Sequence, residues 1–255
     1  MNNNYKVSVI TAVLNGADTL SRTINSVAQQ DYPAMEYIVV DGGSTDGTLE
    51  LIESACDIVD CCIEGPDSGI AEAMNKGLSQ ATGDLVLFLH ADDCFADNKA
   101  LTRAMMQVDN LDTIWAFDIL FGDDQRQIRR SPRPFSVWTR FKNPLPHQGV
   151  LCPRRVFDKL GAFDPSLRID MDYDFWLRAY LADVPLRQVP EVLAVMGSGG
   201  VSSRRDWTGL SARFREERRV QLKHAAGMAW RLLYAAYWPL YLAYRRLRIA
   251  FAHCS

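Results

Sequence analysis

The sequence of 255 residues lacks the motifs of several common nucleotide-binding and metal-binding proteins. It has no G-x-x-x-x-G-K-S/T loop, and no G-x-G-x-x-G follows its first predicted strand. Neither a P-loop nucleoside triphosphatase nor a dinucleotide-binding Rossmann protein is therefore expected. Its six cysteines form no C-x-x-C pair, and none has the spacing of a Cys/His zinc site. Most of them are predicted to be small core residues, which favours a reducing cytoplasm.

Long hydrophobic runs are also missing. The uninterrupted apolar stretch of the C-terminal tail, residues 232–244, falls short of the roughly 20 residues that a membrane-spanning helix needs. Residues 1–6 are polar, with no apolar segment behind a charged head, so no signal peptide is expected.

Charge is distributed unevenly along the chain. Residues 200–255 hold 11 Lys and Arg against three acids, a balance of +8, and the net charge of −3 leaves −11 for the rest. A basic tail on an acidic body suggests that the tail contacts an anionic surface. The length suits one large domain with a tail, and we place the division after residue 203, with a helical tail over residues 204–255.

Short apolar segments alternate with amphipathic ones, which is typical of βαβ units. This predicts an α/β fold with a mostly parallel central sheet flanked by helices. The segment 122–146, rich in Arg and Pro, is predicted to be irregular. Strands are predicted at residues 7–11, 37–40, 58–63, 85–89, 114–121 and 186–195, and helices at 18–30, 48–54, 70–80, 99–108 and 172–182.

Acidic residues follow two of these strands. Asp41 ends the second strand, and the apolar run 85–89 is followed by His90, Asp92 and Asp93. Ligands of open α/β sheets bind at the carboxyl ends of strands, and two carboxylates there suit a divalent cation that holds a diphosphate. Aspartate also closes turns and caps helices. These acids alone favour neither interpretation, and the rest of the chain decides between them.

Five sequence blocks together resemble those of family 2 glycosyltransferases, inverting enzymes of the GT-A fold that act on nucleotide-sugars. The resemblance spans residues 5–203, and its third block is most similar to bacterial enzymes that build exopolysaccharide, colanic-acid-like or O-antigen chains. It implies a GT-A fold with a C-terminal helical tail. The blocks are residues 11–15, 39–48, 65–77 and 88–93, and residues 161–164 together with 172–178.

The resemblance also implies a donor site. Asp93 is its expected metal ligand, Asp92 touches ribose or metal, and the ion is Mg²⁺ or Mn²⁺. His90 stands where Asn or Asp is commoner, which leaves two carboxylates rather than three. The metal is then held chiefly by diphosphate, water and Asp93. The residues expected to contact the nucleotide-sugar are Thr11, Asn15, Asp41, Asp67, Asn75, Lys76 and Asp92.

Inverting transfer needs a carboxylate that takes the proton of the acceptor hydroxyl. Residues 170–174 supply three acids at alternating positions. A calcium loop is excluded, because Phe175 and Leu181 stand where that loop needs Gly and Glu. Acids at a helix start also favour the helix dipole. The resemblance aligns Asp172 with the catalytic aspartate, and Asp170 and Asp174 are expected to be structural.

Further residues are predicted on the acceptor or lid side of the site. Each has a structural alternative: a satisfied histidine for His147 and core packing for Trp176. Residues 197–200 are predicted to be a flexible joint, and residues 199–202 a mobile lid from which Arg204 or Arg205 reaches the diphosphate. These acceptor or lid residues are His147, Gln148, Trp176 and Arg204.

The tail, over residues 225–252, is rich in Trp and Tyr with flanking Arg. This composition is typical of an interfacial helix on anionic lipid. A helix that packs on the catalytic domain or on a second subunit is the alternative. Nucleic acid is not an expected partner, because no nucleic-acid module accompanies the basic residues.

The predicted protein is an inverting hexosyl- or N-acetylhexosaminyltransferase of bacterial surface polysaccharide biosynthesis. It moves a sugar from a nucleotide-diphosphate donor, with a UDP-sugar favoured, to a glycan or lipid-linked acceptor. Its predicted location is the cytoplasm, at the inner face of the cytoplasmic membrane. A nucleotidyltransferase and a non-catalytic nucleotide-sugar-binding or scaffold protein of the same fold are the alternatives.

Overall fold

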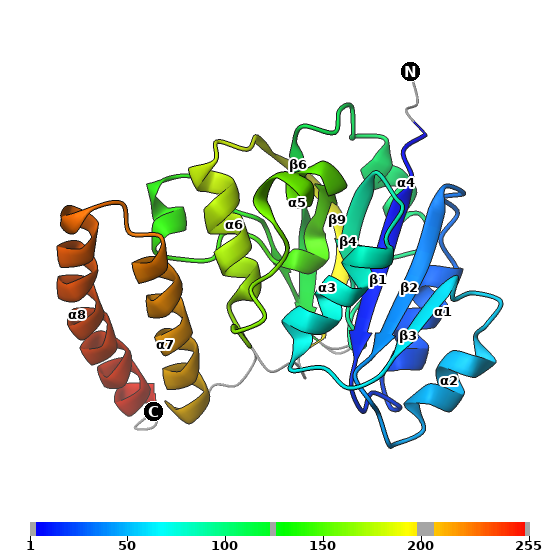
Figure 1. Ribbon diagram of the computed structural model, residues 1–255, viewed down its shortest axis with the longest axis horizontal. Helices are drawn as coiled ribbons and strands as arrows, with labels where there is room; N and C mark the ends of the chain where they lie inside the picture. The colour runs from blue at the N-terminus through cyan, green and yellow to red at the C-terminus, as the bar shows by residue number, and fades with distance from the viewer. Residues whose placement is uncertain (1–3, 123–125, 198–206, 253–255) are drawn as a thin grey trace. The chain divides into compact units, whose positions relative to one another are not determined.

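The structure, a computed structural model, describes residues 4–122, 126–197 and 207–252, with side chains as far as Arg248. The chain divides into two compact units, residues 1–204 and 205–255. The division predicted after residue 203 lies outside the described residues, and so does Arg204. Unit 1 is an α/β domain and unit 2 is a pair of helices (Figure 1).

Unit 1 begins with the predicted alternation of strands and helices and continues with shorter elements (Figure 1). Its first half contains β1 (Val7–Val13), α1 (Leu20–Ala28), β2 (Met35–Asp41), α2 (Thr48–Ser54), β3 (Cys61–Glu64), α3 (Ile70–Gln80) and β4 (Leu85–Phe88). Its second half contains β5 (Cys94–Phe95), α4 (Ala100–Met105), β6 (Ile114–Gly122), β7 (Gln127–Arg130), the 3₁₀ turns η1 (Val137–Arg140) and η2 (His147–Gly149), β8 (Val150–Pro153), α5 (Arg154–Leu160), α6 (Met171–Leu181) and β9 (Leu186–Met196).

The strands form one nine-stranded sheet in the order β3-β2-β1-β4-β8-β6-β9-β5, with β7 beside β6. The first four strands are parallel, as predicted. The other half is mixed, because β8 runs antiparallel to both β4 and β6. No α-helix is found between β6 and β8 in the described part of the chain, and antiparallel strands need no helical crossover.

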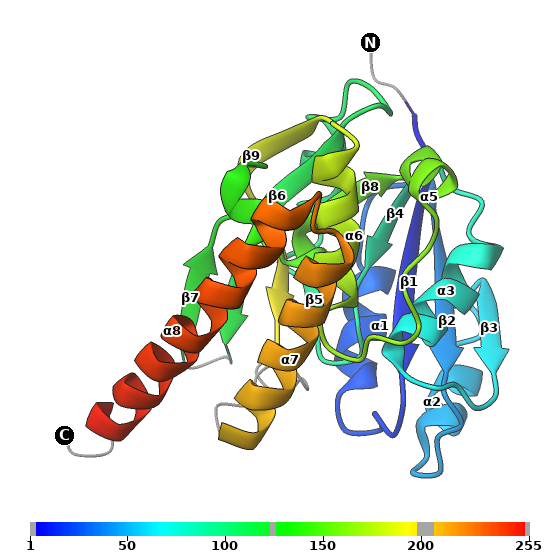
Figure 2. The same cartoon turned by 60° about the vertical axis from the view of Figure 1, so that its left-hand side comes forward.

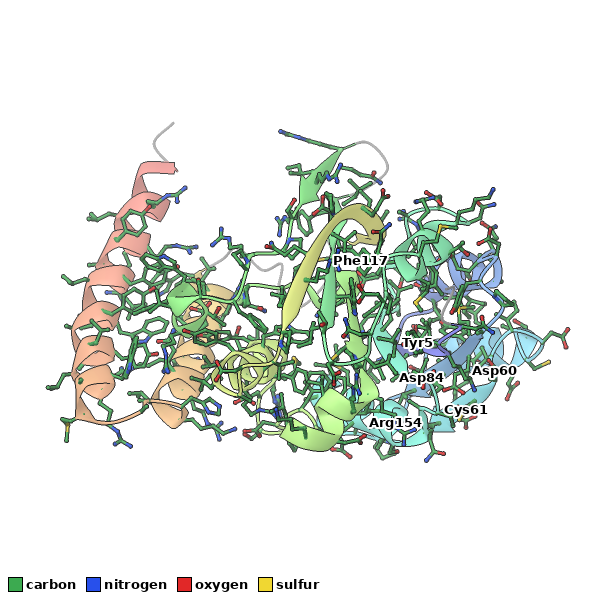
Figure 3. The ribbon with its side chains drawn as sticks, turned by 90° about the horizontal axis from the view of Figure 1, so that it is seen from above. Tyr5, Asp60, Cys61, Asp84, Phe117 and Arg154 are labelled. Carbon is green, nitrogen blue, oxygen red and sulfur yellow. The ribbon has the colours of Figure 1, made fainter. Side chains whose placement is uncertain are left out.

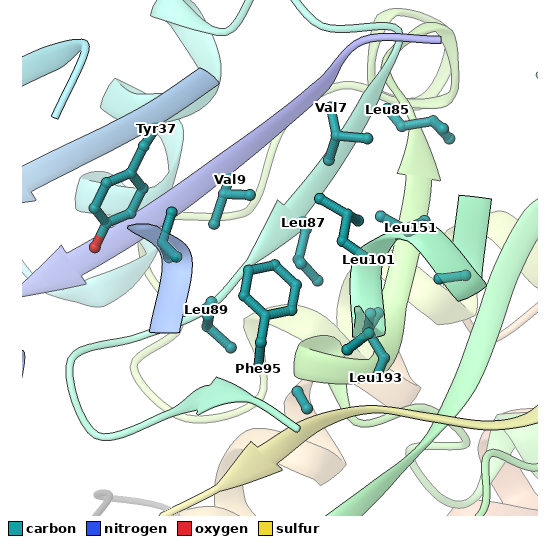
Figure 4. Close-up of a cluster of buried hydrophobic side chains, with 14 of the residues drawn as sticks. Val7, Val9, Tyr37, Leu85, Leu87, Leu89, Phe95, Leu101, Leu151 and Leu193 are labelled. Carbon is teal, nitrogen blue, oxygen red and sulfur yellow. The ribbon is translucent and has the colours of Figure 1, made fainter. Parts of the chain in front are cut away.

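Helices cover both faces of the sheet because side chains alternate along each strand. Val7 and Val9 of β1 face a core shared with α1 and α4, which Figure 4 shows around Leu87 and Leu101. Between these valines and beyond them, β1 turns its other side chains toward α3. At Gly77 of α3 a Cβ atom would lie only 2.5 Å from a methyl of Ile10 in β1. Glycine there lets α3 lie close against the sheet.

Polar groups at the amino ends of the parallel strands are paired with one another in hydrogen bonds. Figure 3 looks onto this end, where Asp60 and Asp84 are labelled. Glu36 accepts hydrogen bonds from Lys6 Nζ at 2.6 Å, Ser8 Oγ at 2.5 Å and the Thr82 N–H at 2.6 Å. Burial alone would raise the pKa of Glu36, but these bonds lower it to about 2. This end of the sheet is built for stability.

Several local expectations are corrected by the structure. The segment 122–146 is not irregular throughout, because it contains β7 and η1. Its β7 pairs with β6 in a hairpin, although all four of its residues are exposed and no apolar alternation marks it as a strand. The cysteines are also less buried than predicted: Cys94 and Cys152 are buried, but Cys56 and Cys62 are exposed and Cys61 is half-buried.

Unit 2 consists of two helices, α7 (Trp207–Lys223) and α8 (Met228–Ala252), joined by a short turn (Figure 2). Phe214 of α7 contacts the rings of Trp238 and Tyr241 at centroid distances of 6.1 and 5.4 Å. The indole of Trp238 donates a hydrogen bond to Gln221 at 2.8 Å. The tail is thus a helical hairpin with an aromatic seam. Across the described residues, we find no helix of the length and apolarity that crossing a membrane requires.

Candidate active site

The carboxyl ends of β1, β2 and β4 meet at one edge of the sheet, because these strands are parallel neighbours. The loops after β1 and β2 are tied together by Asn15, which adopts a left-handed conformation with φ of 51°. Its Oδ1 accepts a hydrogen bond from the Thr45 N–H at 2.9 Å, and its own N–H donates to Ser44 Oγ at 2.8 Å. Asn tolerates this backbone conformation better than most residues. Asn15 therefore shapes the edge on which the other residues lie.

Asp41, the last residue of β2, is fully buried. Its Oδ1 accepts hydrogen bonds from the N–H groups of Gly43 and Ser44, both at 2.8 Å. Its Oδ2 is buried and has no partner within the described residues. Asp67 lies beside it: a Cβ atom on Gly42 would be 2.6 Å from Asp67 Oδ2. A buried acceptor without a donor is costly, and a donor group of a ligand would remove this cost at Asp41 Oδ2.

Asp93 is the second buried carboxylate of this edge. Its Oδ2 accepts from the His90 N–H and its Oδ1 from the Gly197 N–H, both at 3.2 Å. Burial, and then the neighbouring charge of Asp92, raise the pKa of Asp93 to about 7. Gly197 is close to Asp92 as well, since a Cβ atom there would lie 2.5 Å from the Asp92 carbonyl oxygen.

The Asp92–Asp93 pair suits a magnesium or manganese ion. Both ions take carboxylate oxygens, and Mg²⁺ is usually bound by one or two carboxylates together with substrate phosphates. Burial and the charge of Asp92 raise the pKa of Asp93, and a cation bound at the pair would oppose both effects. No group of three His, Cys, Asp or Glu residues in the described ranges is arranged around a common metal position. The remaining ligands would then come from the donor diphosphate and water.

Asp172 stands at the start of α6, where its carboxylate faces residues from a different part of the chain. Its Oδ2 accepts a hydrogen bond from Asn143 Nδ2 at 2.9 Å and lies 3.5 Å from His147 Nδ1. Its Oδ1 accepts from the Tyr173 N–H at 2.7 Å. These contacts fix the orientation of a largely buried carboxylate, whose side chain has 13% of its surface exposed. Sequence reasoning missed Asn143, because a single Asn among prolines carries no signal.

His147 links Asp172 to the acidic loop after β4. Burial alone would lower the pKa of His147, but its hydrogen bond to Asp172 and the charges of Asp172, Asp93 and Asp92 raise it. The imidazole also contacts the ring of His90, with centroids 4.8 Å apart. Burial, and then the nearby His147, hold the pKa of His90 well below its usual value.

The histidine pair has unused polar atoms. Both ring nitrogens of His90 and Nε2 of His147 are buried and have no hydrogen-bond partner in the described residues. Gln148, next to His147, is buried and its side chain hydrogen-bonds Asp93. The structure thus brings together His90, Asp92, Asp93, His147, Gln148 and Asp172. Sequence reasoning treated His90 only as a departure from the family pattern, because its contact with His147 depends on the fold.

Three residues that were predicted to contact the nucleotide form hydrogen bonds within the protein. Thr11 is fully buried; it donates to the Leu89 carbonyl oxygen at 2.5 Å and accepts from Tyr37 at 3.0 Å. The amide of Asn75 both donates to and accepts from the backbone of Phe163, at 2.9 and 3.0 Å. Lys76 donates to the Pro66 carbonyl oxygen at 2.9 Å. Thr11 and Asn75 therefore serve as links within the protein, and Lys76 supports the loop that carries Asp67.

On the acceptor side, Trp176 is a correction. Its side chain is buried and its ring contacts Phe175 edge-on at 5.1 Å, so it packs in the core instead of forming a floor for a sugar. Asp174 has the structural role that was expected, because it is buried and pairs with Arg178 at 2.8 Å. Arg204 and the lid predicted around it lie outside the described residues.

The known proteins that this chain resembles in sequence are glycosyltransferases. The profile of "Glycosyl transferase family 2" matches residues 8–161. An uncharacterized glycosyltransferase of Mycobacterium tuberculosis is 35% identical over 209 residues, which are 78% of each chain. A PGL/p-HBAD biosynthesis glycosyltransferase of Mycobacterium bovis is 31% identical over 182 residues, 68% of this chain and 69% of that one.

Solved structures share the fold at lower identity. Staphylococcus aureus TarS, residues 1–349 in complex with UDP-GlcNAc, is 22% identical with a TM-score of 0.67, over 88% of this chain and 68% of that one. The mannosyltransferase PcManGT of Pyrobaculum calidifontis, in complex with GDP-Man and Mn²⁺, is 20% identical with a TM-score of 0.67, over 98% and 76%. The family profile and these relatives together show that the chain belongs to glycosyl transferase family 2 and has the GT-A fold of a glycosyltransferase.

Proposed function

We propose that the protein transfers a hexosyl or N-acetylhexosaminyl group, with inversion, from a nucleotide-diphosphate donor to a hydroxyl of a glycan or lipid-linked acceptor. The observation that carries this proposal is that Asp172 and the Asp92–Asp93 pair both lie close to one histidine. His147 lies 3.5 Å from Asp172 and feels the charges of Asp93 and Asp92. A base and a diphosphate-binding pair in one site are what a single displacement at an anomeric carbon requires.

On the donor side, Asp41 and Asp67 hold the nucleoside. The free Oδ2 of Asp41 accepts a hydrogen bond from the base or ribose. Asp92 and Asp93 hold Mg²⁺ or Mn²⁺, which offsets the charge of the diphosphate as it leaves. A UDP-sugar is the favoured donor, and two structural neighbours were solved with UDP-GlcNAc or with GDP-Man and Mn²⁺.

On the acceptor side, Asp172 is the general base. Its carboxylate takes the proton of the acceptor hydroxyl while that oxygen forms a bond to the anomeric carbon. The bond from this carbon to the diphosphate breaks on the opposite face, so the configuration inverts. The hydrogen bond from Asn143 orients the carboxylate toward the acceptor, and such positioning accounts for a large share of catalysis in general.

A thermal-shift screen tests the donor side. Ligands that bind the folded state raise its melting temperature, so purified protein is heated with UDP-, GDP-, dTDP- and CMP-sugars, with and without Mn²⁺. We expect a shift with one nucleotide class that depends on metal. No shift with any of them favours the non-catalytic scaffold. Release of pyrophosphate from a nucleoside triphosphate, with no sugar transfer, favours the nucleotidyltransferase instead.

The anomeric configuration of the product tests the inversion. Proton NMR of the first product formed distinguishes an inverted linkage from a retained one. The proposed role of the enzyme is in surface polysaccharide biosynthesis. We also propose that it lies in the cytoplasm, at the inner face of the cytoplasmic membrane. A lipid-linked acceptor then shares that surface with the enzyme.

A further inference from the structure

The long helix α8 has two faces of different character. With 100° per residue, the aromatic residues Tyr234, Trp238 and Tyr241 fall on one face, which contacts α7 through Phe214 and Gln221. This differs from the sequence-based expectation, in which the Trp and Tyr side chains of the tail lie in the lipid interface. Three of them lie in the seam of the hairpin instead.

The opposite side of α8 is apolar and exposed. We call it the outer face, and every one of its eight residues is exposed. Leu240 has 73% of its surface exposed and Leu232 64%. Side chains at spacings of three and four residues share one face of a helix, and no charged residue falls within the outer face. Its residues are Ala229, Leu232, Leu233, Ala236, Leu240, Ala243, Tyr244 and Leu247.

Such a face is unusual for a folded protein in water. Contiguous exposed apolar patches mark sites that bind a protein or a membrane. Across the described residues, six of the 13 large apolar side chains that remain exposed belong to α8. The aromatic face of the same helix is already used within the hairpin, so the outer face is available for a partner.

The charges around the outer face indicate what that partner is. Arg246 and Arg248 are exposed on either side of it, and residues 200–255 carry a balance of +8. Arg218 and Arg219 of α7 are exposed as well, while Glu217 is buried and paired with Arg213 at 3.4 Å. A second copy of the tail would bring two such positive charges together and be repelled. An anionic surface attracts both.

We propose that the outer face of α8 binds the surface of an anionic lipid bilayer, with the helix axis lying along the interface. Its leucines enter the boundary between headgroups and acyl chains, and the flanking arginines contact lipid phosphates, as in other interfacial helices. The helix does not cross the bilayer, because its aromatic face is paired with α7. That this brings the enzyme to a lipid-linked acceptor rests on the proposed function.

Vesicle co-sedimentation of the full chain tests the proposal. The wild-type protein is expected to sediment with vesicles of equal parts phosphatidylglycerol and phosphatidylcholine, and at least about tenfold more weakly with phosphatidylcholine alone. The variant Leu232→Glu/Leu240→Glu places two charges in the outer face and is expected to lose at least about tenfold in binding to the anionic vesicles. Both positions are exposed, so its melting temperature stays unchanged.

Met106→Glu is the matched control, because Met106 is an equally exposed apolar residue, at 68%, at the end of α4 in unit 1. It is expected to bind vesicles like the wild type. Equal binding by the double variant overturns the proposal, as does binding that is as strong to phosphatidylcholine alone. A wild-type dimer that becomes monomeric in the double variant also overturns it, since a second copy then covers the outer face.

The donor thermal shift separates this proposal from the proposed function. The double variant is expected to show the same shift with nucleotide-sugar and Mn²⁺ as the wild type. If the wild type binds vesicles but shows no donor shift, the proposed function fails and the membrane surface stands. If it shows a donor shift but does not bind anionic vesicles, the membrane surface fails and the proposed function stands.

Discussion

The two ends of the parallel half of the sheet treat their polar groups in opposite ways. At the amino ends, Glu36 accepts hydrogen bonds from Lys6, Ser8 and Thr82, and its pKa falls to about 2. At the carboxyl ends, one oxygen of Asp41 has no partner among the residues that the structure describes, and burial raises the pKa of Asp93 to about 7. Both ends are acidic, but only the first stabilises its charges.

This difference separates a carboxylate that stabilises the fold from the carboxylates that we propose to bind the donor and its metal. Most buried polar groups in proteins are hydrogen-bonded, and the exceptions cluster at functional sites. The carboxyl-end loops therefore give up stability that the amino-end loops retain. A substitution at either end is expected to affect one property, activity or stability, and leave the other unchanged.

Removing the base has the largest expected effect. Asp172→Asn retains the shape of the side chain and one of its two acceptor oxygens, so it keeps a hydrogen bond from either Asn143 or the Tyr173 N–H, but it cannot accept a proton from an acceptor hydroxyl. We expect kcat to fall by about 10²–10⁴-fold, with the melting temperature and the donor thermal shift unchanged. The measurement is steady-state transfer to the acceptor. Asp158→Asn, on exposed α5, is the control, and a variant Asp172→Asn that turns over at the wild-type rate excludes Asp172 as the base.

The second largest effect is expected at Asp41, the last residue of β2. Asp41→Asn replaces a charged acceptor by a neutral amide, and we expect donor affinity to fall by about 10- to 100-fold, the value of a charge-assisted hydrogen bond. Isothermal titration with the donor nucleotide measures it. Asp60→Asn is the matched substitution at the other end, where Asp60 accepts from the Tyr37 N–H at 2.7 Å. If both variants lose affinity equally, the contrast between the two ends is wrong.

Metal affinity is expected to depend on pH through Asp93. Burial and the charge of Asp92 raise its pKa to about 7, so a proton competes with the cation below that pH. Mn²⁺ affinity in the presence of UDP then falls by up to about tenfold for each pH unit below 7. Titration of Mn²⁺ at several pH values measures the slope. Asp93→Asn is expected to bind the metal weakly and without this slope, and a flat wild-type profile contradicts the assignment.

The smallest effect is expected at Glu36, and it concerns stability alone. Its pKa is lowered from 4.5 to about 2, so the carboxylate stabilises the fold above about pH 4.5, and this contribution is lost as the pH falls toward 2. Because Glu36 is only partly buried, solvent screens its charged partners, and Glu36→Gln should lower the free energy of unfolding by about 1 kcal/mol at neutral pH. Denaturant unfolding at pH 7 and pH 3 measures it.

Donor affinity is the control measurement for Glu36→Gln. It should stay at the wild-type value, because Glu36 lies at the amino ends of the strands, away from the proposed donor site. The difference in stability between this variant and the wild type should shrink as the pH is lowered. A variant that is as stable as the wild type at pH 7 shows that the hydrogen bonds of Glu36 contribute nothing net.

Sequence patterns predicted the elements whose signals are local. The helices at residues 48–54 and 70–80 were placed within their observed bounds, because periodic apolar residues and flanking glycines mark them. The parallel direction of the first four strands followed from βαβ alternation, but their order in the sheet was not predicted. β7, in contrast, is entirely exposed and pairs with β6 without any apolar pattern of its own.

The site was predictable to the extent that it lies at strand ends and helix starts. Asp41 and Asp93 have the buried positions that their places after strands indicate. Asn143 and the contact of His90 with His147 arise only when distant segments meet. Asn75 shows the reverse: its motif indicated a ligand contact, but the backbone of Phe163 occupies its amide.

Gly197 has a consequence for engineering the protein. Its N–H donates to Asp93 and its lack of a side chain makes room for Asp92, so the residue directly after β9 is also part of the acidic loop's support. A shortened enzyme that is meant to lose only the tail must therefore keep this residue. A chain that stops before it loses a hydrogen bond of the donor site together with the tail, and a defect in such a chain reports on both.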